Sequence, residues 1–194
     1  SLDALARYGA QIGSVHPAMP FADPQTAGVQ LIGASFAIEA SHEPLRLWLE
    51  HLVVILNGRA LLLTAEQKAL YHAALVIASN YTVTLYAIAE SLLQSLNAPQ
   101  PTIDSALGRL VSATVENIGA HGIPKALTGP LTRADMGTLH AHLEALHTHA
   151  PHVEQAYRLL ARLSYPMLVA RGIDTQKLDS LLNPQDSPHA DNHS

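Results

Sequence analysis

The chain has 194 residues, of which 48% are hydrophobic and 14% charged, and its formal net charge is −5. This length and composition fit one or two globular domains with a sizeable core, and they argue against nucleic acid or an anionic membrane surface as a partner. The absence of cysteine excludes disulfides, thiolate zinc sites and a cysteine nucleophile.

The longest uninterrupted apolar runs are short. LVVIL at 52–56 and ALVIA at 74–78 fall well below the roughly eighteen residues that span a bilayer. The first residues also show no signal-peptide pattern. We therefore expect a soluble, cytoplasmic protein with no membrane partner.

The first third of the chain, residues 1–63, is predicted to be α/β. A helix end closed by Gly9 is followed by expected strands at 11–16, 35–40 and 59–63 and an amphipathic helix at 42–58. Three strands with one crossover lack the neighbours that a parallel sheet needs to bury its edges, so this part resembles a partial domain. No G-x-G-x-x-G joins a strand to a helix, and this chain alone therefore lacks a Rossmann-type pyrophosphate site.

From Thr64 onwards the pattern predicts helices only. Thr64 is an expected N-cap, with Gln67 in the capping-box position. The predicted helices, with prolines marking the breaks, are 65–96, 102–120, 135–149, 151–171 and 174–182. The polar residues 184–194 are expected to be disordered. The predicted fold class is therefore mainly α, with an all-helical domain at 64–183 after a partial α/β remnant at 1–63.

The first long helix carries an unusual polar stripe. In KALYHAALVIASN, Lys68, His72, Ser79 and Asn80 fall near one side at 100° per residue. Such a stripe is either a solvated outer face or the lining of a site. A surface helix would carry more charge than the single lysine between Lys68 and Glu90. We predict that the stripe lines a cleft and that Asn80 is largely buried.

Three blocks carry a family resemblance: GSVHPAMPF (13–21), KALYHAALVIASNY (68–81) and ALTGPLTRAD (126–135), followed by His142. They resemble a bacterial family of NAD(P)-dependent oxidoreductases in which a Rossmann-like domain precedes an all-helical domain of unknown function. The architecture is related to that of pyrroline-carboxylate reductase and the prephenate and hydroxyacid dehydrogenases. The resemblance implies hydride transfer with NAD or NADP for the whole protein, and a substrate-binding, dimerising helical part. This chain departs from the family at Ala134, where the pattern is Arg-Gly-Asp, so a close backbone approach there is expected to change.

The resemblance also names candidate catalytic residues. Related hydroxyacid dehydrogenases place a Lys-x-x-x-Asn pair on the corresponding helix, and here the pair is Lys68 and His72. A lysine ammonium can polarise a reacting oxygen, and a histidine suits proton transfer near neutral pH. His16 ends a predicted strand, where open sheets place ligands, and prephenate dehydrogenases have a similar His-Pro. The alternatives are a solvated helix start for Lys68 and His72 and a plain turn at His16.

The candidate substrate-binding residues are Ser79, Asn80, Thr128, Arg133 and His142. The first two need hydrogen-bond partners, which a substrate or a neighbouring helix would provide. Arg133 could bind a substrate carboxylate, although pairing with Asp135 is an alternative, and Asp135 is expected to cap the next helix. His142 matches the family pattern and is expected to matter for a pocket or for packing.

The twelve histidines raise the question of a metal site. His140, Glu144 and His147 lie at i, i+4 and i+7 on one helical face. Closed zinc sites need four supported ligands, and histidines near a helix C-terminus are also favoured by the helix dipole. We therefore expect no metal.

The leading hypothesis is the substrate-binding and dimerisation portion of an NAD(P)-dependent oxidoreductase that acts on a small molecule. The alternatives are a non-catalytic dimerisation or ligand-sensing module and a histidine-based metal-binding protein. A homodimer is expected because the helices at 81–96 and 157–170 are apolar on more than one side. Without a glycine-rich loop, the chain itself is expected to bind no NAD or NADP tightly.

Overall fold

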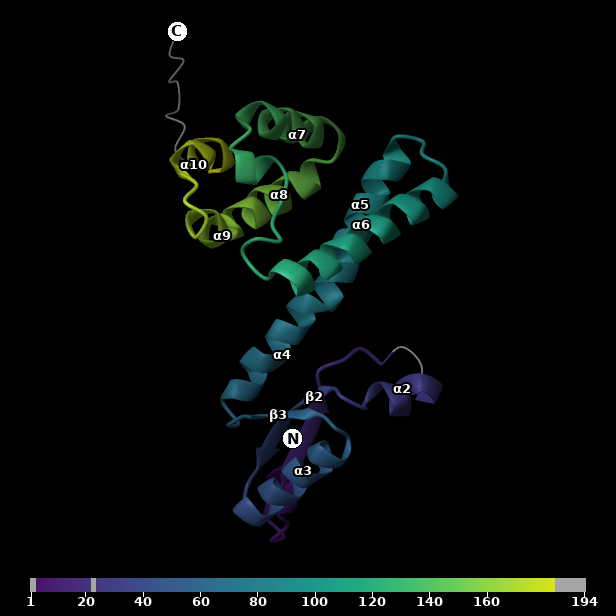
Figure 1. Cartoon of the computed structure of the whole chain (residues 1–194), viewed down its shortest axis with the longest axis vertical. Coiled ribbons are helices and arrows are strands. Elements are labelled where there is room, and N and C mark those ends of the chain that lie inside the picture. Colours follow the sequence, from purple (N-terminus) through teal and green to yellow (C-terminus); the bar gives the residue numbers. More distant parts are fainter. Residues whose placement is uncertain (1–2, 22–23, 184–194) are drawn as a thin grey trace. The chain divides into compact units, whose positions relative to one another are not determined.

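The computed structural model describes residues 3–21 and 24–183. Its internal contacts divide the chain into two compact units, Ser1–Leu85 and Tyr86–Ser194. As Figure 1 shows, the strands of the described part lie early in the chain, interspersed with helices, and only helices follow the last strand. The predicted fold class, mainly α with a partial α/β part at the beginning, is confirmed.

The first unit contains a three-stranded sheet. Its elements are α1 (Asp3–Ala6), β1 (Gly13–Pro17), α2 (Pro24–Gln30), β2 (Ser35–Ala40), α3 (Glu43–Ile55), β3 (Arg59–Leu62), α4 (Gln67–Ala78) and the start of α5 (Asn80–Ser95). The strand order is β1-β2-β3, with β1 antiparallel and β3 parallel to β2. The sheet is therefore mixed, not parallel as the sequence argument assumed, and α2 was not predicted. Periodicity reveals that a strand exists but does not reveal its direction.

The two faces of the sheet carry different residues. Phe36 and Ile38 of β2 are 2% and 1% exposed, and they pack with Leu49 and Val53 of α3. Because side chains alternate along a strand, Ala37 and Glu39 point to the opposite face. The register pairs Ala37 with His16 and Glu39 with Ser14. One face thus forms the core with α3, and the other presents His16, Ser14 and Glu39.

Helix α3 and its exit turn fix the position of β3. Arg46 bonds Glu50 at 2.6 Å one turn along the helix. After α3 the chain turns through Asn57, whose φ is 52°, and Gly58. A Cβ on Gly58 would lie 2.6 Å from the carbonyl oxygen of Ala34 and 2.7 Å from the Phe36 ring. Only glycine fits this close approach, which sets β3 beside β2.

Helices α4 and α5 form an almost continuous apolar stretch. The Thr64 amide donates to Gln67 Oε1 at 3.0 Å, which is one of the two contacts of a capping box. However, α4 begins at Gln67 with Glu66 as its N-cap, so the prediction that Thr64 is the N-cap is wrong. The predicted single helix at 65–96 is interrupted only at Ser79. Gln67–Ser95 contains a stretch of 18 residues with a mean hydropathy of 1.2, so it is long and apolar enough to cross a membrane, and none of the residues in that stretch is buried. This stretch was not predicted from the sequence, because only uninterrupted apolar runs were considered there. Length and composition alone do not establish insertion into a membrane.

The second unit contains the remaining helices. After the end of α5 come α6 (Gln100–His121), the 3₁₀ turn η1 (Pro130–Arg133), α7 (Met136–His149), α8 (Pro151–Leu163), α9 (Tyr165–Val169) and α10 (Gln176–Leu182). The core of α7 to α10 consists of Leu139, Leu143, Ala161, Leu168, Leu178 and Leu182. The predicted helix at 151–171 is divided at Ser164, before Pro166. The expected disordered tail, 184–194, lies outside the described residues.

Ala134 has a left-handed backbone, with φ 47° and ψ 41°. An L-residue with a Cβ adopts this conformation at a cost, and glycine adopts it freely. The family that this chain resembles has glycine at this position. The left-handed backbone conformation is a sufficient reason for that glycine, so the close backbone approach predicted from the sequence is not needed to explain it.

Candidate functional site

A cavity of about 400 Å³ lies in the first unit, against the sheet face that does not bind α3. The strands β1 and β2 contribute His16 and Glu39, and α4 contributes Lys68, Tyr71 and His72. The spacing of these α4 residues, i, i+3 and i+4, places them on one side of the helix. The structure therefore brings the three predicted catalytic residues, His16, Lys68 and His72, to one cavity.

Direct contacts connect the polar groups of this cavity. Lys68 Nζ lies 2.6 Å from Glu39 Oε2. The His16 ring makes edge-to-face contacts with Tyr71 and His72, at centroid distances of 5.8 and 5.9 Å. The Tyr71 hydroxyl donates to the backbone oxygen of His16 at 3.4 Å, which is a long hydrogen bond. The helix and the sheet thus hold a lysine, two imidazoles and a phenol around one space.

Burial raises the pKa of the Tyr71 hydroxyl above its ordinary value of 10.0. Desolvation has this effect because it disfavours the charged phenolate. The Tyr71 hydroxyl can act as a hydrogen-bond donor and as an acceptor.

A second cavity, of about 390 Å³, shares His16 and His72 with the first. Its other lining residues include Met19, Pro20, Leu75, Val76, Ser79 and Asn80. The polar stripe therefore lines two adjoining cavities, but Asn80 is exposed, and the expectation that it is largely buried is wrong. Asn80 borders this cavity from an exposed position, because apolar neighbours in the sequence do not by themselves bury a residue.

The other predicted substrate-binding residues belong to the second unit. Thr128 and Arg133 are exposed in and near η1. His142 Nδ1 lies 2.9 Å from the Tyr157 hydroxyl, and the two rings meet edge-to-face. This contact joins α7 to α8, so His142 has a packing partner. Whether these three residues bind a substrate stays a prediction.

Asp135 caps α7, as expected. Its carboxylate accepts hydrogen bonds from the Thr138 amide at 3.1 Å and from the Thr138 hydroxyl at 2.8 Å. These hydrogen bonds, with a smaller contribution from the charge of Arg133, lower the pKa of Asp135. Capping of α7 explains why an aspartate is present at position 135, and the charge of Arg133 helps to lower the pKa of that aspartate.

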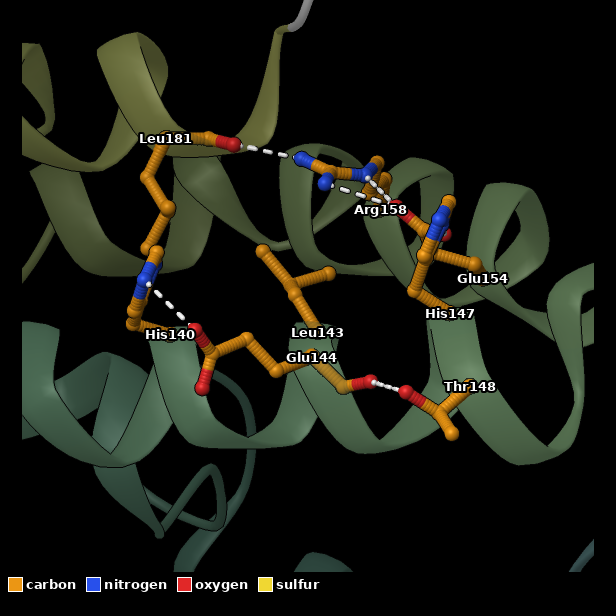
Figure 2. A pocket seen from close by; sticks show the side chains of 8 residues that line it. All are labelled: His140, Leu143, Glu144, His147, Thr148, Glu154, Arg158 and Leu181. Carbon is orange, nitrogen blue, oxygen red and sulfur yellow. Dashed lines mark hydrogen bonds and ion pairs between the residues drawn. The ribbon is translucent and has the colours of Figure 1, made fainter.

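The histidine-rich helix α7 borders a separate cavity of about 510 Å³, which Figure 2 shows. His140 pairs with Glu144 at 3.3 Å, and His147 pairs with Glu154 of α8 at 3.0 Å. Arg158 also binds Glu154, at 2.7 Å, and donates to the Leu181 carbonyl oxygen at 2.5 Å. Among the described residues, no group of three or more metal-ligating side chains is placed to hold a metal ion. His140 and His147 instead contact two different glutamates, Glu144 and Glu154.

Sequence reasoning missed Glu39 and Tyr71. Glu39 is the single charged residue of β2, and its alternation with Phe36 and Ile38 places it away from the core. Tyr71 follows Lys68 by three residues and so shares its helix face. Both signals were present, but Glu39 becomes a neighbour of Lys68 only through tertiary contact.

The glycines of the sheet do not form a phosphate cradle. A Cβ on Gly13 would lie 2.9 Å from the side chains of Leu45 and Leu49, and Gly58 is packed against the backbone of Ala34. These glycines serve packing within the unit. Across the described residues, nothing matches the glycine-rich strand-turn-helix that holds a dinucleotide pyrophosphate. The described glycines therefore provide no Rossmann-type cradle for the phosphates of NAD or NADP.

Comparison with known proteins gives a family and two solved structures. The family model "Domain of unknown function (DUF2520)" matches residues 34–164. Protein TM1727 from Thermotoga maritima is similar with a TM-score of 0.73 and 20% identity, covering 82% of this chain and 62% of that chain. The putative NADP oxidoreductase BF3122 from Bacteroides fragilis is similar with a TM-score of 0.65 and 28% identity, covering 81% and 58%.

This chain therefore spans less than two thirds of the length of either solved protein. At 20% identity, the first similarity shows a shared fold alone. No curated protein matches the chain.

Proposed function

This chain belongs to the DUF2520 family, and from that premise we propose that it is the substrate-binding and dimerisation portion of an NAD(P)-dependent oxidoreductase. The fold shared with BF3122 supports the NAD(P)-related class. The observation that carries the proposal is the convergence of His16, Lys68 and His72 on one cavity. The substrate is a small molecule with a carbonyl or hydroxyl group.

Each of these residues has a role that its chemistry allows. Lys68 donates to the oxygen of the reacting carbonyl or hydroxyl and stabilises negative charge there. His72 and His16 are 5.9 Å apart by ring centroid, close enough for one imidazole to hold the transferred proton while the other orients the substrate. NAD(P), when bound to the whole protein, supplies the hydride chemistry.

Binding of small molecules tests the site without requiring turnover. We expect compounds with a 2-hydroxy or 2-oxo group, as acids and as amides, to shift the imidazole C–H NMR signals of His16 and His72. Lys68→Ala should weaken this binding about tenfold, because a charged donor is lost. Lys125→Ala is the matched control, since Lys125 is an exposed lysine of the second unit. If no compound moves these signals, or if both variants behave alike, the proposal fails.

We do not expect this chain alone to bind NAD or NADP tightly. Because the described residues lack a phosphate cradle, calorimetric titration with NADH or NADPH should show no binding in the micromolar range. Micromolar binding would mean that the nucleotide is held in another way.

The dimerisation part of the proposal rests on exposed apolar side chains of α4 and α5. Leu70, Ile77 and Val83 are 77%, 62% and 69% exposed. A second copy of the same surface is the simplest cover, because two-fold homodimers are the commonest closed assembly. A membrane is the competing cover for Gln67–Ser95. Light scattering on the purified protein and flotation with liposomes separate the two.

Two alternatives remain distinguishable from the proposal. A non-catalytic ligand-sensing module would keep the same cavity, and it would differ by having no turnover in the full-length protein with NAD(P)H. A histidine-based metal protein would contain metal after purification without a tag, and the ion pairs of His140 and His147 give that alternative no support. A cytoplasmic location stays a prediction.

A further inference from the structure

The charges that face the 400 Å³ cavity cancel one another. Of the described residues that line it, only Lys68 and Glu39 carry a formal charge when histidine is counted as neutral. They form one ion pair of 2.6 Å, with side chains 48% and 29% exposed. Tyr71 adds a neutral hydroxyl to the lining. The candidate catalytic lysine therefore does not present a free positive charge.

This pairing decides which head group the cavity favours. A carboxylate that approaches Lys68 Nζ also approaches the carboxylate of Glu39, and like charges repel at this range. A lysine ammonium has three donors, so two remain after the bond to Glu39. The free lone pairs of Glu39 can accept from an N–H or O–H group. The pair thus offers donors and acceptors side by side, which match a neutral polar group such as an amide or a hydroxyl.

We infer that Glu39 is a specificity-determining residue, which makes the cavity prefer an uncharged polar head group over a carboxylate. The inference rests on the proposed function, because it takes this cavity as the substrate site. A purely structural ion pair between β2 and α4 is the rival explanation. That rival predicts that loss of Glu39 lowers stability and leaves the preference between charged and neutral ligands unchanged.

The test compares 2-hydroxybutyrate with 2-hydroxybutyramide, which differ mainly in charge. Binding is followed on the imidazole signals of His16 and His72 in the full chain and in Glu39→Gln. The matched control is Glu50→Gln: Glu50 is 28% exposed, pairs with Arg46 at 2.6 Å and lies on α3 outside the cavity lining. Thermal unfolding checks that each variant is folded. Lys68→Gln, a second variant, removes the cation while keeping Glu39.

In the unaltered chain, the amide should bind more tightly than the acid. Glu39→Gln should tighten acid binding about tenfold, because the repulsive charge is removed near a half-exposed lysine, and leave amide binding within about twofold. The gain should shrink in about 1 M salt, where the Debye length is about 3 Å. Glu50→Gln should change the binding of neither ligand. Lys68→Gln should make the acid bind more weakly than it binds to the unaltered chain.

Two results would overturn the inference. If the acid binds more tightly than the amide in the unaltered chain, or if Glu39→Gln shifts both ligands equally, Glu39 does not set the preference, while the proposed function survives. If neither compound moves the histidine signals in any variant, the inference and the proposed site fail together.

Discussion

Helices α7 to α10 and helices α4 and α5 are both rich in apolar residues, yet they bury them very differently. Leu139, Leu168 and Leu178 are each 0% exposed in the core of α7 to α10. In contrast, no described residue of α4 or α5 is buried. Short connections let α7 to α10 fold back on one another, whereas within the first unit α4 contacts the sheet through Lys68, Tyr71 and His72 and buries none of its residues. Apolar composition therefore predicts that a surface needs a cover and does not predict which molecule provides it.

The largest expected effect comes from truncating a leucine to alanine, once in α7 to α10 and once in α4. Leu168→Ala should lower the free energy of unfolding by about 3–5 kcal/mol at any protein concentration, because it opens a cavity in the core. Leu70→Ala, at a position 77% exposed, should cost little in dilute solution and more as concentration rises and copies assemble. Urea unfolding at several concentrations measures both. If both variants lower the free energy of unfolding equally at every protein concentration, the two regions do not differ in this way.

A charge placed on the exposed apolar surface tests what covers it. Val83→Glu should raise the dimer dissociation constant about a hundredfold, or about 3 kcal/mol, because an unpaired carboxylate would enter an apolar interface. Thr84→Glu, at an exposed polar position of the same helix, is the control. Size-exclusion chromatography with light scattering gives the mass of each. A protein that is already monomeric at micromolar concentration would contradict the assignment to a second copy.

Backbone conformation allows a smaller test within the packed unit. Ala134→Gly should stabilise the chain by about 1 kcal/mol, since glycine adopts the left-handed conformation without strain. The reciprocal change, Gly129→Ala, replaces a glycine with φ of 92° and should destabilise it. Thermal melts of the two variants should move in opposite directions. A melting temperature that falls on Ala134→Gly would show that the alanine side chain contributes more by packing than its backbone costs.

The smallest expected effect is the pH dependence of the stabilisation by Glu154. Hydrogen bonds from Arg158 and then His147 hold the pKa of Glu154 below its ordinary value of 4.5. Because the folded pKa is the lower one, this stabilisation is present above 4.5 and is lost as the pH falls through the folded value. The difference in melting temperature between the unaltered chain and Glu154→Gln should therefore narrow at acid pH. Glu116→Gln, at an exposed position of α6, should show no such trend.

Much of the fold follows from local sequence signals. Alternation in SFAIEA predicts β2 at its observed bounds, and the aspartate before α7 predicts its cap. Strand direction and α2 were missed, because apolar periodicity carries no information on how the chain returns from Pro17 to Ser35. A local pattern also cannot show that Asn80 stays exposed, since exposure depends on what packs over the helix.

The candidate site was only partly predictable for the same reason. Lys68 and His72 are one helical turn apart, so their proximity follows from the sequence. Glu39 precedes Lys68 by 29 residues and meets it only after the sheet and α4 have formed. Contacts of that kind require the pairing of β2 with β3 and the position of α4 beside the sheet, which the sequence alone does not specify.

The register of β1 with β2 has a consequence for how this protein can change in length. Alternate residues of the same two strands supply the core, through Phe36 and Ile38, and the cavity, through His16 and Glu39. An insertion or deletion of one residue inside either strand would exchange the two sets and damage both. Among homologues, β1 and β2 should therefore keep a constant length, and length variation between them should fall in the segment from Pro17 to Ser35.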